Sequence, residues 1–234
     1  MSPAGVLVMA KAPVAGRAKT RLACQVGNVA AAELAAAALL DTLLACEEAF
    51  SADVRVIAIS GDLSRAANLA ALRSRLRGWR VIGQRGMGFG HRLCAAHHDA
   101  SRLLCRPIVQ IGMDTPQIES ADLASVVAQL DEGRTDAVLG PADDGGWWVL
   151  GLREPARAKL LVDVPMSTEW TAQHTQRLLE RDGAIVKGAA RLRDVDTAAD
   201  AEAVSLAAPD TRFARAWRTH AGSAASRFGM ESPC

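Results

Sequence analysis

The sequence has no excess charge of one sign and no paired cysteines, and each absence excludes a class of protein. Its 27 basic and 26 acidic residues leave a net charge of +1, whereas nucleic-acid and membrane-surface partners require a concentrated basic excess. The 5 cysteines are scattered and none forms a C-x-x-C pair, so neither a zinc site nor a disulfide framework is indicated. We therefore expect a protein from a reducing compartment with no nucleic-acid partner.

Long apolar runs are missing as well. No segment approaches the ~20 consecutive apolar residues that span a bilayer. The run at residues 6–10 is too short for the apolar region of a signal peptide, and Lys11 follows it directly. The alanine-rich stretch at residues 29–44 is interrupted by Glu33 and Asp41, so it predicts a buried helix. These features predict a cytoplasmic protein with no membrane partner.

Short apolar segments alternate with longer segments of helical spacing. Strands are predicted at residues 6–10, 54–60, 79–83, 108–112, 137–139 and 147–152, with brief candidates at 185–186 and 192–195. Helices are predicted at residues 29–50, 63–77, 92–105, 120–131, 168–181 and 197–206, and Ser167 or Thr168 is the expected N-cap of the helix at 168–181. Continuous apolarity is typical of strands covered on both faces. The pattern predicts an α/β fold, in which helices cover both faces of a mostly parallel central sheet.

The chain has no repeat and no long linker. We expect a single domain at residues 1–222 and a flexible tail at 223–234. The chain also lacks G-x-S-x-G, an evident Cys–His signature and a G-x-G-x-x-G after its first predicted strand, which argues against hydrolases and dinucleotide-dependent dehydrogenases. His97 and His98 have no acidic or cysteine companion at metal-ligand spacing, so we expect them to be structural.

The loop after the first predicted strand, K-A-P-V-A-G-R-A-K-T-R, carries four cations in eleven residues. In a parallel sheet, ligands bind at the carboxyl ends of the strands, and such a loop can wrap a polyphosphate. It does not have the spacing of a P-loop, and a solvated basic loop is the alternative. The predicted nucleotide- or phosphate-binding residues here are Lys11, Ala12, Pro13, Gly16, Arg17, Lys19 and Arg21, with Lys19 also a catalytic candidate.

Two further motifs follow predicted strands. In Q-R-G-M-G-F-G-H-R, alternating glycines permit close backbone approach to a base or ribose, and Gln84, Gly86 and Arg92 are the predicted nucleotide-binding residues. A flexible turn explains the glycines equally well. In G-M-D-T-P, Asp114 is well placed to hold a divalent ion that bridges phosphates. Its alternative role is that of a turn cap.

The segment G-P-A-D-D-G-G-W-W brings carboxylates, glycines and indoles to one strand junction. Asp143 or Asp144 could bind a sugar hydroxyl or act as a base, and an aromatic face could stack on a sugar or base. Consecutive strand residues point to opposite faces, so at most one of Trp147 and Trp148 should line a site. The alternative is a β-turn with a core tryptophan. The predicted residues of an acceptor or sugar site are Gly145, Gly146, Trp147, Ser167 and Thr168.

The segment R-D-V-D-T-A-A-D offers a second place for a metal-facing carboxylate. Asp194 and Asp196 are expected to share one face of a short strand. Helix capping is the alternative, and it accounts for Thr197 and Asp200.

Taken in order, these five motifs resemble those of a bacterial family known as selenodomain-associated transferases, in the nucleotide-diphospho-sugar transferase (GT-A) superfamily. The matching segments are AKAPVAGRAKTRL, QRGMGFGHRL, IGMDTP, VLGPADDGGWWVLGL and DVDTAAD, which span about residues 5–203. The N-terminal segment is also similar to that of phospholactate guanylyltransferases. The chain departs from the family pattern at Trp147, where members usually carry Tyr, and at Met166, where they usually carry Trp. Both departures concern the expected acceptor region.

The resemblance implies a GT-A fold and a Mg²⁺ or Mn²⁺ ion held by Asp114, with Asp196 as second ligand. It further implies a nucleotide or nucleotide-sugar substrate and a small-molecule acceptor. Glycosyl transfer from a nucleotide-sugar is the leading expectation. Nucleotidyl transfer with release of pyrophosphate is the first alternative, and a non-catalytic nucleotide-binding regulator is the second. Whether the chain forms a homodimer is left open.

Overall fold

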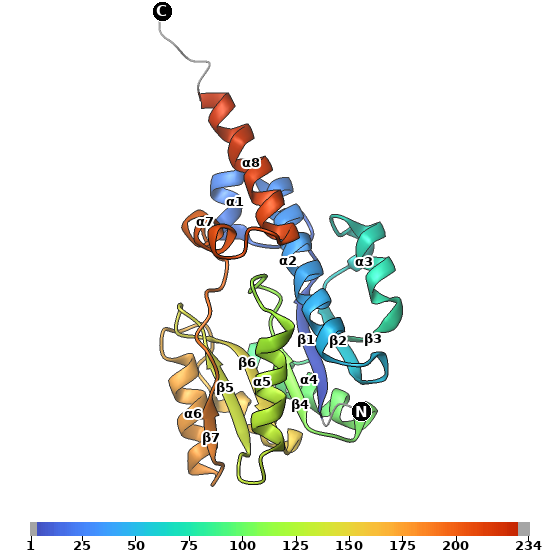
Figure 1. Cartoon of the computed structure of the whole chain (residues 1–234), viewed down its shortest axis with the longest axis vertical. Helices are drawn as coiled ribbons and strands as arrows, with labels where there is room; N and C mark the ends of the chain where they lie inside the picture. The colour runs from blue at the N-terminus through green and yellow to red at the C-terminus, as the bar shows by residue number, and fades with distance from the viewer. Residues whose placement is uncertain (1–3, 229–234) are drawn as a thin grey trace, which may run out of the picture.

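The computed structural model describes residues 4–228 and contains one seven-stranded sheet (Figure 1). The strands are β1 (Gly5–Lys11), β2 (Arg55–Ser60), β3 (Arg80–Gly83), β4 (Ile108–Ile111), β5 (Ala137–Pro141), β6 (Trp147–Leu152) and β7 (Val186–Gly188). They are arranged in the order β3-β2-β1-β4-β6-β5-β7. Strand β6 runs antiparallel to both of its neighbours, and the other pairings are parallel. The predicted α/β fold with a mostly parallel sheet is therefore confirmed.

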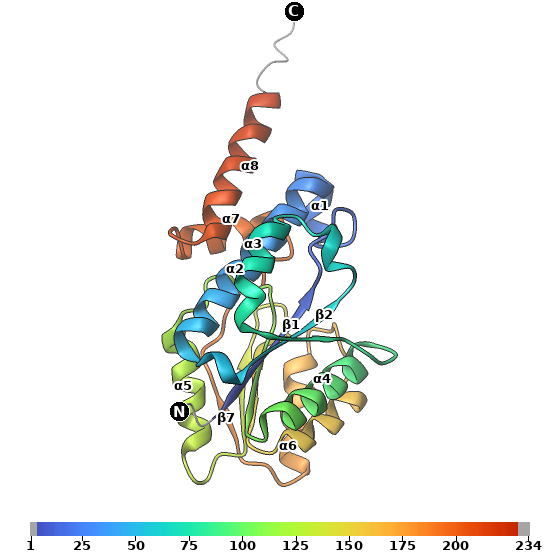
Figure 2. The same cartoon turned by 90° about the vertical axis from the view of Figure 1, so that its right-hand side faces the viewer.

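Helices cover both faces of the sheet, as Figures 1 and 2 show. One face carries α2 (Asn28–Ala49), α3 (Leu69–Arg75) and α5 (Ser120–Asp131), and the other carries α4 (Phe89–Leu104), α6 (Thr171–Arg181) and the 3-10 segment η4 (Pro155–Asp163). Three more helices lie beyond the carboxyl end of β1, namely α1 (Thr20–Val26), α7 (Ala198–Ala207) and α8 (Arg212–Phe228). Short 3-10 turns, η1 (Ala52–Val54), η2 (Leu63–Arg65) and η3 (Leu76–Gly78), complete the described elements.

Helix α2 is long and strongly apolar. By length and composition it could cross a membrane, and no other helix in residues 4–228 meets the same test. In the structure, 78% of the most apolar 18-residue stretch of α2 is buried inside the protein. Small side chains let α2 pack closely on several neighbours at once, which is the composition expected of a central core helix. The prediction of a buried helix in this stretch is confirmed.

A third apolar cluster joins α1, α7 and α8 to the end of α2. Beside this cluster, Asp41 connects α2 to α8. It is 7% exposed and accepts hydrogen bonds from the backbone N–H groups of Arg212 (3.1 Å) and Phe213 (2.8 Å). Burial raises the pKa of the Asp41 carboxyl, and the two backbone bonds partly oppose this. A buried carboxylate from α2 therefore caps the first turn of α8. Helix α8 then extends away from the sheet (Figure 2).

Several predicted elements need correction. The single helix expected at residues 63–77 is divided into η2, α3 and η3. Between η2 and α3 the chain leaves the helical path, and the Ala67 N–H donates to the Pro13 carbonyl (2.9 Å) of the first loop. The helix expected at 168–181 begins at Thr171, and neither Ser167 nor Thr168 is its N-cap. No strand forms at 192–195 in the described structure, where Leu192 makes only an isolated bridge to Ala142.

Helix α8 has no counterpart among the predicted elements. It continues through residues 223–228, the first part of the expected flexible tail, and residues 229–234 lie outside the described chain. The division of the chain at residue 222 stays a prediction.

Candidate functional site

Two cavities meet at the carboxyl ends of β1 and β4. The basic cavity, of about 220 Å³, is lined by the loop after β1 and by Asp196. The sheet cavity, of about 320 Å³, lies over β1, β4 and β6, between the start of α4 and residues 166–171. Lys11, Met113 and Asp114 line both cavities. Asp114 therefore stands on their common wall, at the strand ends where ligands of parallel sheets bind.

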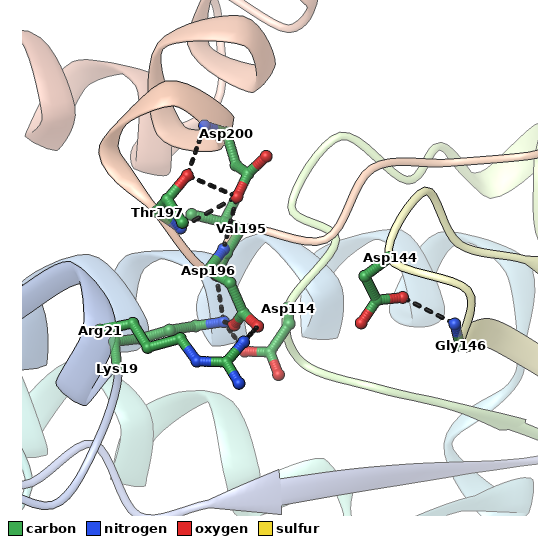
Figure 3. A network of polar contacts seen from close by, with 9 residues as sticks. All are labelled: Lys19, Arg21, Asp114, Asp144, Gly146, Val195, Asp196, Thr197 and Asp200. Atoms are coloured by element: carbon green, nitrogen blue, oxygen red, sulfur yellow. Dashed lines mark hydrogen bonds and ion pairs between the residues drawn. The ribbon is translucent and has the colours of Figure 1, made fainter. Parts of the chain in front are cut away.

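Lys19 ties three segments together inside this wall. Its ammonium donates to Asp114 Oδ1 (2.7 Å), to Asp196 Oδ1 (3.3 Å) and to the Val195 carbonyl (Figure 3). The side chain is only 8% exposed. Burial alone would lower the pKa of Lys19, but Asp114 and Asp196 outweigh it and hold the pKa above its ordinary value. The ammonium is therefore charged, and it holds two carboxylates at one point.

The backbone of Lys19 is itself unusual. Its φ of 48° and ψ of 49° lie in the left-handed region, which costs a non-glycine residue of order 1–3 kcal/mol. This conformation directs the side chain from the start of α1 toward Asp114. Arg21, two residues on, is exposed and pairs with Asp196 Oδ2 at 3.3 Å. The loop after β1 thus supplies two cations to the same carboxylate.

Asp194 brings a further carboxylate to the sheet cavity. Burial and the nearby Asp114 and Asp144 carboxylates together raise the pKa of Asp194 to about 7, although Lys19 opposes them. The sequence placed Asp194 and Asp196 on one face of a strand. In the described structure no strand forms there, and the two carboxylates lie in different cavities: Asp194 lines the sheet cavity and Asp196 lines the basic cavity.

The two neighbouring aspartates at residues 143 and 144 have different surroundings. Asp144 lines the sheet cavity, and its Oδ1 accepts the Gly146 N–H at 2.8 Å. In the view of Figure 3, Asp114 lies between this carboxylate and the Lys19–Asp196 pair. Asp143 lines neither cavity and pairs with Arg193 Nε at 3.0 Å. Of the two, the geometry favours Asp144 for contact with a substrate.

A β-bulge decides which tryptophan faces the site. The pairing register of β5 and β6 shifts between Gly140 and Pro141, opposite Trp147. Trp148 is therefore on the α5 side of the sheet together with Val149, and its Nε1 donates to the Ala190 carbonyl at 2.8 Å. Trp147 packs on the opposite side and lines the sheet cavity. Of the two indoles, Trp147 alone lines the sheet cavity, and the bulge determines which one does.

The turn before β6 is packed against residues 165–171. Gly145 has a φ of +86°, and a Cβ there would lie 2.1 Å from the Glu169 carbonyl oxygen. Its own carbonyl accepts the Ala172 N–H at 2.9 Å. Within the opposing loop, Thr171 Oγ1 donates to the Pro165 carbonyl at 2.9 Å. This packing turns the side chains of Met166, Ser167, Thr168 and Thr171 toward the sheet cavity.

The loop between β3 and α4 forms the other side of the sheet cavity. Gln84 lines it, but its Nε2 donates to the carbonyls of Ala10 and Ala58, both at 2.9 Å, and so joins the ends of β1 and β2. Phe89 and Arg92, in the first turn of α4, also line this cavity. The Arg92 guanidinium lies 5.5 Å from the centre of the Phe89 ring.

Most of the predicted site residues lie at the two cavities. Those that line one or both are Lys11, Arg17, Lys19, Arg21, Gln84, Arg92, Asp114, Asp144, Gly146, Trp147, Ser167, Thr168 and Asp196. Those that line neither are Ala12, Pro13, Gly16, Gly86, Asp143 and Gly145. The second group shapes the loops, since Gly16 and Gly86 have φ of 72° and 120° and Ala12 is buried.

Gln110 is a cavity residue that the sequence did not single out. It lies in the middle of β4, is 2% exposed and lines the sheet cavity. A glutamine inside the apolar run I-V-Q-I was the available signal. Behind it lies His97, which is fully buried, and burial lowers its pKa to about 4 while Gln110 opposes this only in part. His97 is therefore neutral at pH 7, in keeping with a structural role.

The carboxylates fit a magnesium or manganese ion. Asp114 and Asp196 already share one cation, the Lys19 ammonium, and Asp194 adds a half-buried carboxyl near Asp114. Carboxylate oxygens are the ligands these ions prefer. In residues 4–228, no group of three or more His, Cys, Asp and Glu side chains has a metal-holding arrangement. Mg²⁺ in proteins is commonly held by one or two carboxylates, with water and phosphate oxygens as its other ligands.

This architecture is similar to nucleotidyltransferase and GT-A-like folds. The chain belongs to the family described as "Uncharacterized protein conserved in bacteria (DUF2064)", whose model matches residues 39–168. No curated protein matches the chain. Membership of this family is consistent with the superfamily that the sequence motifs indicate.

Solved structures show the same fold. A "putative nucleotide-diphospho-sugar transferase" from Desulfovibrio desulfuricans G20 superposes with a TM-score of 0.81, at 24% identity over 96% of each chain. A cytidylyltransferase from Leptospira borgpetersenii gives a TM-score of 0.55 at 17% identity, over 86% of this chain and 84% of that one. A 4-diphosphocytidyl-2C-methyl-D-erythritol synthase from Anaerococcus prevotii gives 0.55 at 11% identity, over 88% of this chain and 96% of that one. At these identities the likeness establishes the fold.

Proposed function

We propose that the protein is a transferase that acts on a nucleotide-activated substrate and moves its sugar to a small acceptor. The observation that carries this proposal is the pair of cavities that meet at Asp114. The basic cavity offers cations suited to phosphates. The sheet cavity offers carboxylates, hydroxyls and an indole suited to a polyhydroxylated compound. The fold shared with nucleotide-utilising transferases supports the same reading.

In the basic cavity, the diphosphate of the donor is bound by Lys11, Arg17 and Arg21. Lys11 and Arg17 have no carboxylate within ion-pair distance among the described residues, so their charges are available to a ligand. Lys19 holds Asp114 and Asp196 in place. These two carboxylates, with Asp194 beside them, are the proposed ligands of a Mg²⁺ or Mn²⁺ ion, which when bound would neutralise charge on the leaving diphosphate.

In the sheet cavity, Asp144 orients the acceptor hydroxyl and accepts its proton. Its bond to the Gly146 N–H fixes one carboxylate oxygen and leaves the other for the hydroxyl. Ser167 and Thr168 offer further hydroxyls on the opposite side of the same cavity, and Trp147 offers an aromatic face.

A second candidate is nucleotidyl transfer, in which a phosphorylated compound attacks the α-phosphate of a nucleoside triphosphate. One observation favours it. The basic cavity brings four cations, Lys11, Arg17, Lys19 and Arg21, to two carboxylates, Asp114 and Asp196, and the surplus suits a triphosphate better than a diphosphate.

A product assay with Mg²⁺ or Mn²⁺ separates these functions. With UDP- and GDP-sugars and a panel of small alcohols, sugar transfer predicts release of the nucleoside diphosphate. With nucleoside triphosphates and small phosphorylated compounds, nucleotidyl transfer predicts release of pyrophosphate. Asp144→Asn should abolish sugar transfer, which needs a base for the acceptor hydroxyl, while leaving nucleotide binding intact. A chain that binds none of these nucleotides, with or without metal, would refute both.

A further inference from the structure

The sheet cavity contains two nitrogen donors that no protein atom satisfies. The Nε of Arg92 and the Nε1 of Trp147 are buried, and neither has a hydrogen-bond partner in the described chain. Both residues line the cavity, from α4 and β6 respectively. Leaving a buried N–H group unbonded is costly, so most such groups in folded proteins are satisfied. Together with the unbonded Oε1 of Gln110, which lines the same cavity, they indicate a ligand that supplies acceptor atoms to the two nitrogens and a donor to the glutamine.

Arg92 also lacks a counter-ion. Within residues 4–228, no carboxylate lies within 4.0 Å of its guanidinium, although Asp114, Asp144 and Asp194 line the same cavity. The guanidinium lies instead against the ring of Phe89. The nearby Arg85, by contrast, pairs with Asp99. A half-buried arginine that faces a cavity without a protein partner is suited to bind an anion from outside.

The nucleotide phosphates do not account for Arg92. The basic cavity has its own cations from the loop after β1, and Arg92 does not line that cavity. Asp114 stands on the wall between the two cavities, so its negative charge lies between Arg92 and the cations that line only the basic cavity, Arg17, Lys19 and Arg21. The anion at Arg92 therefore belongs to the other substrate.

We propose that the sheet cavity binds an acceptor that carries an anionic group, a carboxylate or a phosphate, and that this group is bound by the Arg92 guanidinium and the Trp147 indole N–H. The inference rests on the proposed function in that it takes the occupant of this cavity to be the second substrate. An acceptor bound in this way is oriented by charge. Its anionic group is held at Arg92, and its hydroxyl end is left for Asp144.

Three compounds of similar size test the proposal on the full chain. They are glycerol, which is uncharged, glycerate, which carries a carboxylate, and glycerol 3-phosphate, which carries a phosphate. Binding is measured by calorimetry or ligand-observed NMR. Wild type should bind at least one of the two anions about tenfold more tightly than glycerol, and the better anion identifies the chemical group.

The variants separate the two cavities. Arg92→Met should remove the preference for the anion, Arg92→Lys should keep part of it, and Trp147→Phe, which keeps a ring but lacks the N–H, should weaken it. Arg85→Met is the matched control and should change nothing. Nucleotide binding is titrated separately and should be the same in wild type and Arg92→Met. If wild type binds no nucleotide, it is the proposed function that fails, and not the assignment of the anion to Arg92.

Three results would overturn the inference. The first is that wild type binds neither anion more tightly than glycerol. The second is that Arg92→Met keeps the full preference for the anion. Loss of anion binding in Arg17→Met, with none in Arg92→Met, would assign the anion to the basic cavity.

Discussion

Replacing Lys19 by Met removes the charge that holds the centre of the site together. The two carboxylates that share its ammonium, Asp114 and Asp196, are 42% and 41% exposed, so solvent screens part of their interaction with the 8% exposed lysine. We assign roughly 1 kcal/mol to each of these charged hydrogen bonds and a similar amount to the bond with the Val195 carbonyl. The free energy of unfolding should fall by about 3 kcal/mol.

The assay is urea unfolding at pH 7, followed by tryptophan fluorescence and circular dichroism. Lys187→Met is the matched control, because Lys187 also pairs with a carboxylate, that of Glu132, but both side chains are well exposed, at 41% and 59%. Its effect should stay within about 1 kcal/mol. Mn²⁺ should stabilise Lys19→Met more than it stabilises wild type, because the ion can replace the missing cation between the two carboxylates. Equal losses in the two variants would refute the reasoning about Lys19.

Three further changes test other parts of the structure. Asp41→Ala should lower the free energy of unfolding by about 2 kcal/mol, because it leaves the Phe213 N–H and its neighbour at the start of α8 unbonded; the check is urea unfolding. Gly145→Ala should lower the free energy of unfolding by about 2 kcal/mol or more, measured by thermal unfolding, because the added Cβ meets a backbone carbonyl. Gly183→Ala is the control: it has the similar φ of +83° but open space around it, and it should cost only about 1 kcal/mol. Burial lowers the pKa of His97 to about 4, so between pH 6.5 and 4 the unfolded chain takes up a proton that the folded chain does not. As the pH falls across that window, wild type should lose about 3 kcal/mol of stability relative to His97→Gln, since the other titrating groups are common to both proteins. A wild type and a His97→Gln variant with parallel pH profiles would contradict the last of these.

Local patterns in the sequence were sufficient for much of the fold. The helix at Ser120–Asp131 is predicted with its observed bounds, because its apolar spacing and its ends are encoded within the segment itself. The segment at 63–77 has the same kind of spacing but leaves the helical path at Ala67, whose N–H bonds to Pro13. That partner lies far away in the sequence, so no local pattern reports it. Helix α8 was missed for the same reason, since its cap is Asp41.

The sequence was sufficient to predict which segments meet at the site, but not how their side chains contact one another. The parallel sheet places the first loop, Asp114 and the D-D-G-G turn at one edge, and the sequence indicated each of them. The sequence did not indicate that Lys19 bridges Asp114 and Asp196, because this depends on the left-handed backbone at Lys19 and on the path of the chain before α7. Nor could alternation alone choose between Trp147 and Trp148, since a bulge reverses it.

The central claim is that Asp114 joins a nucleotide site to an acceptor site through a bound divalent ion. Calorimetric titration of nucleoside diphosphates and triphosphates, with and without Mn²⁺, tests it most directly in wild type and Asp114→Asn. We predict that Mn²⁺ tightens nucleotide binding to wild type by at least about tenfold and that Asp114→Asn loses this gain while remaining folded. Nucleotide binding that is the same in both proteins, with and without the ion, would contradict the account.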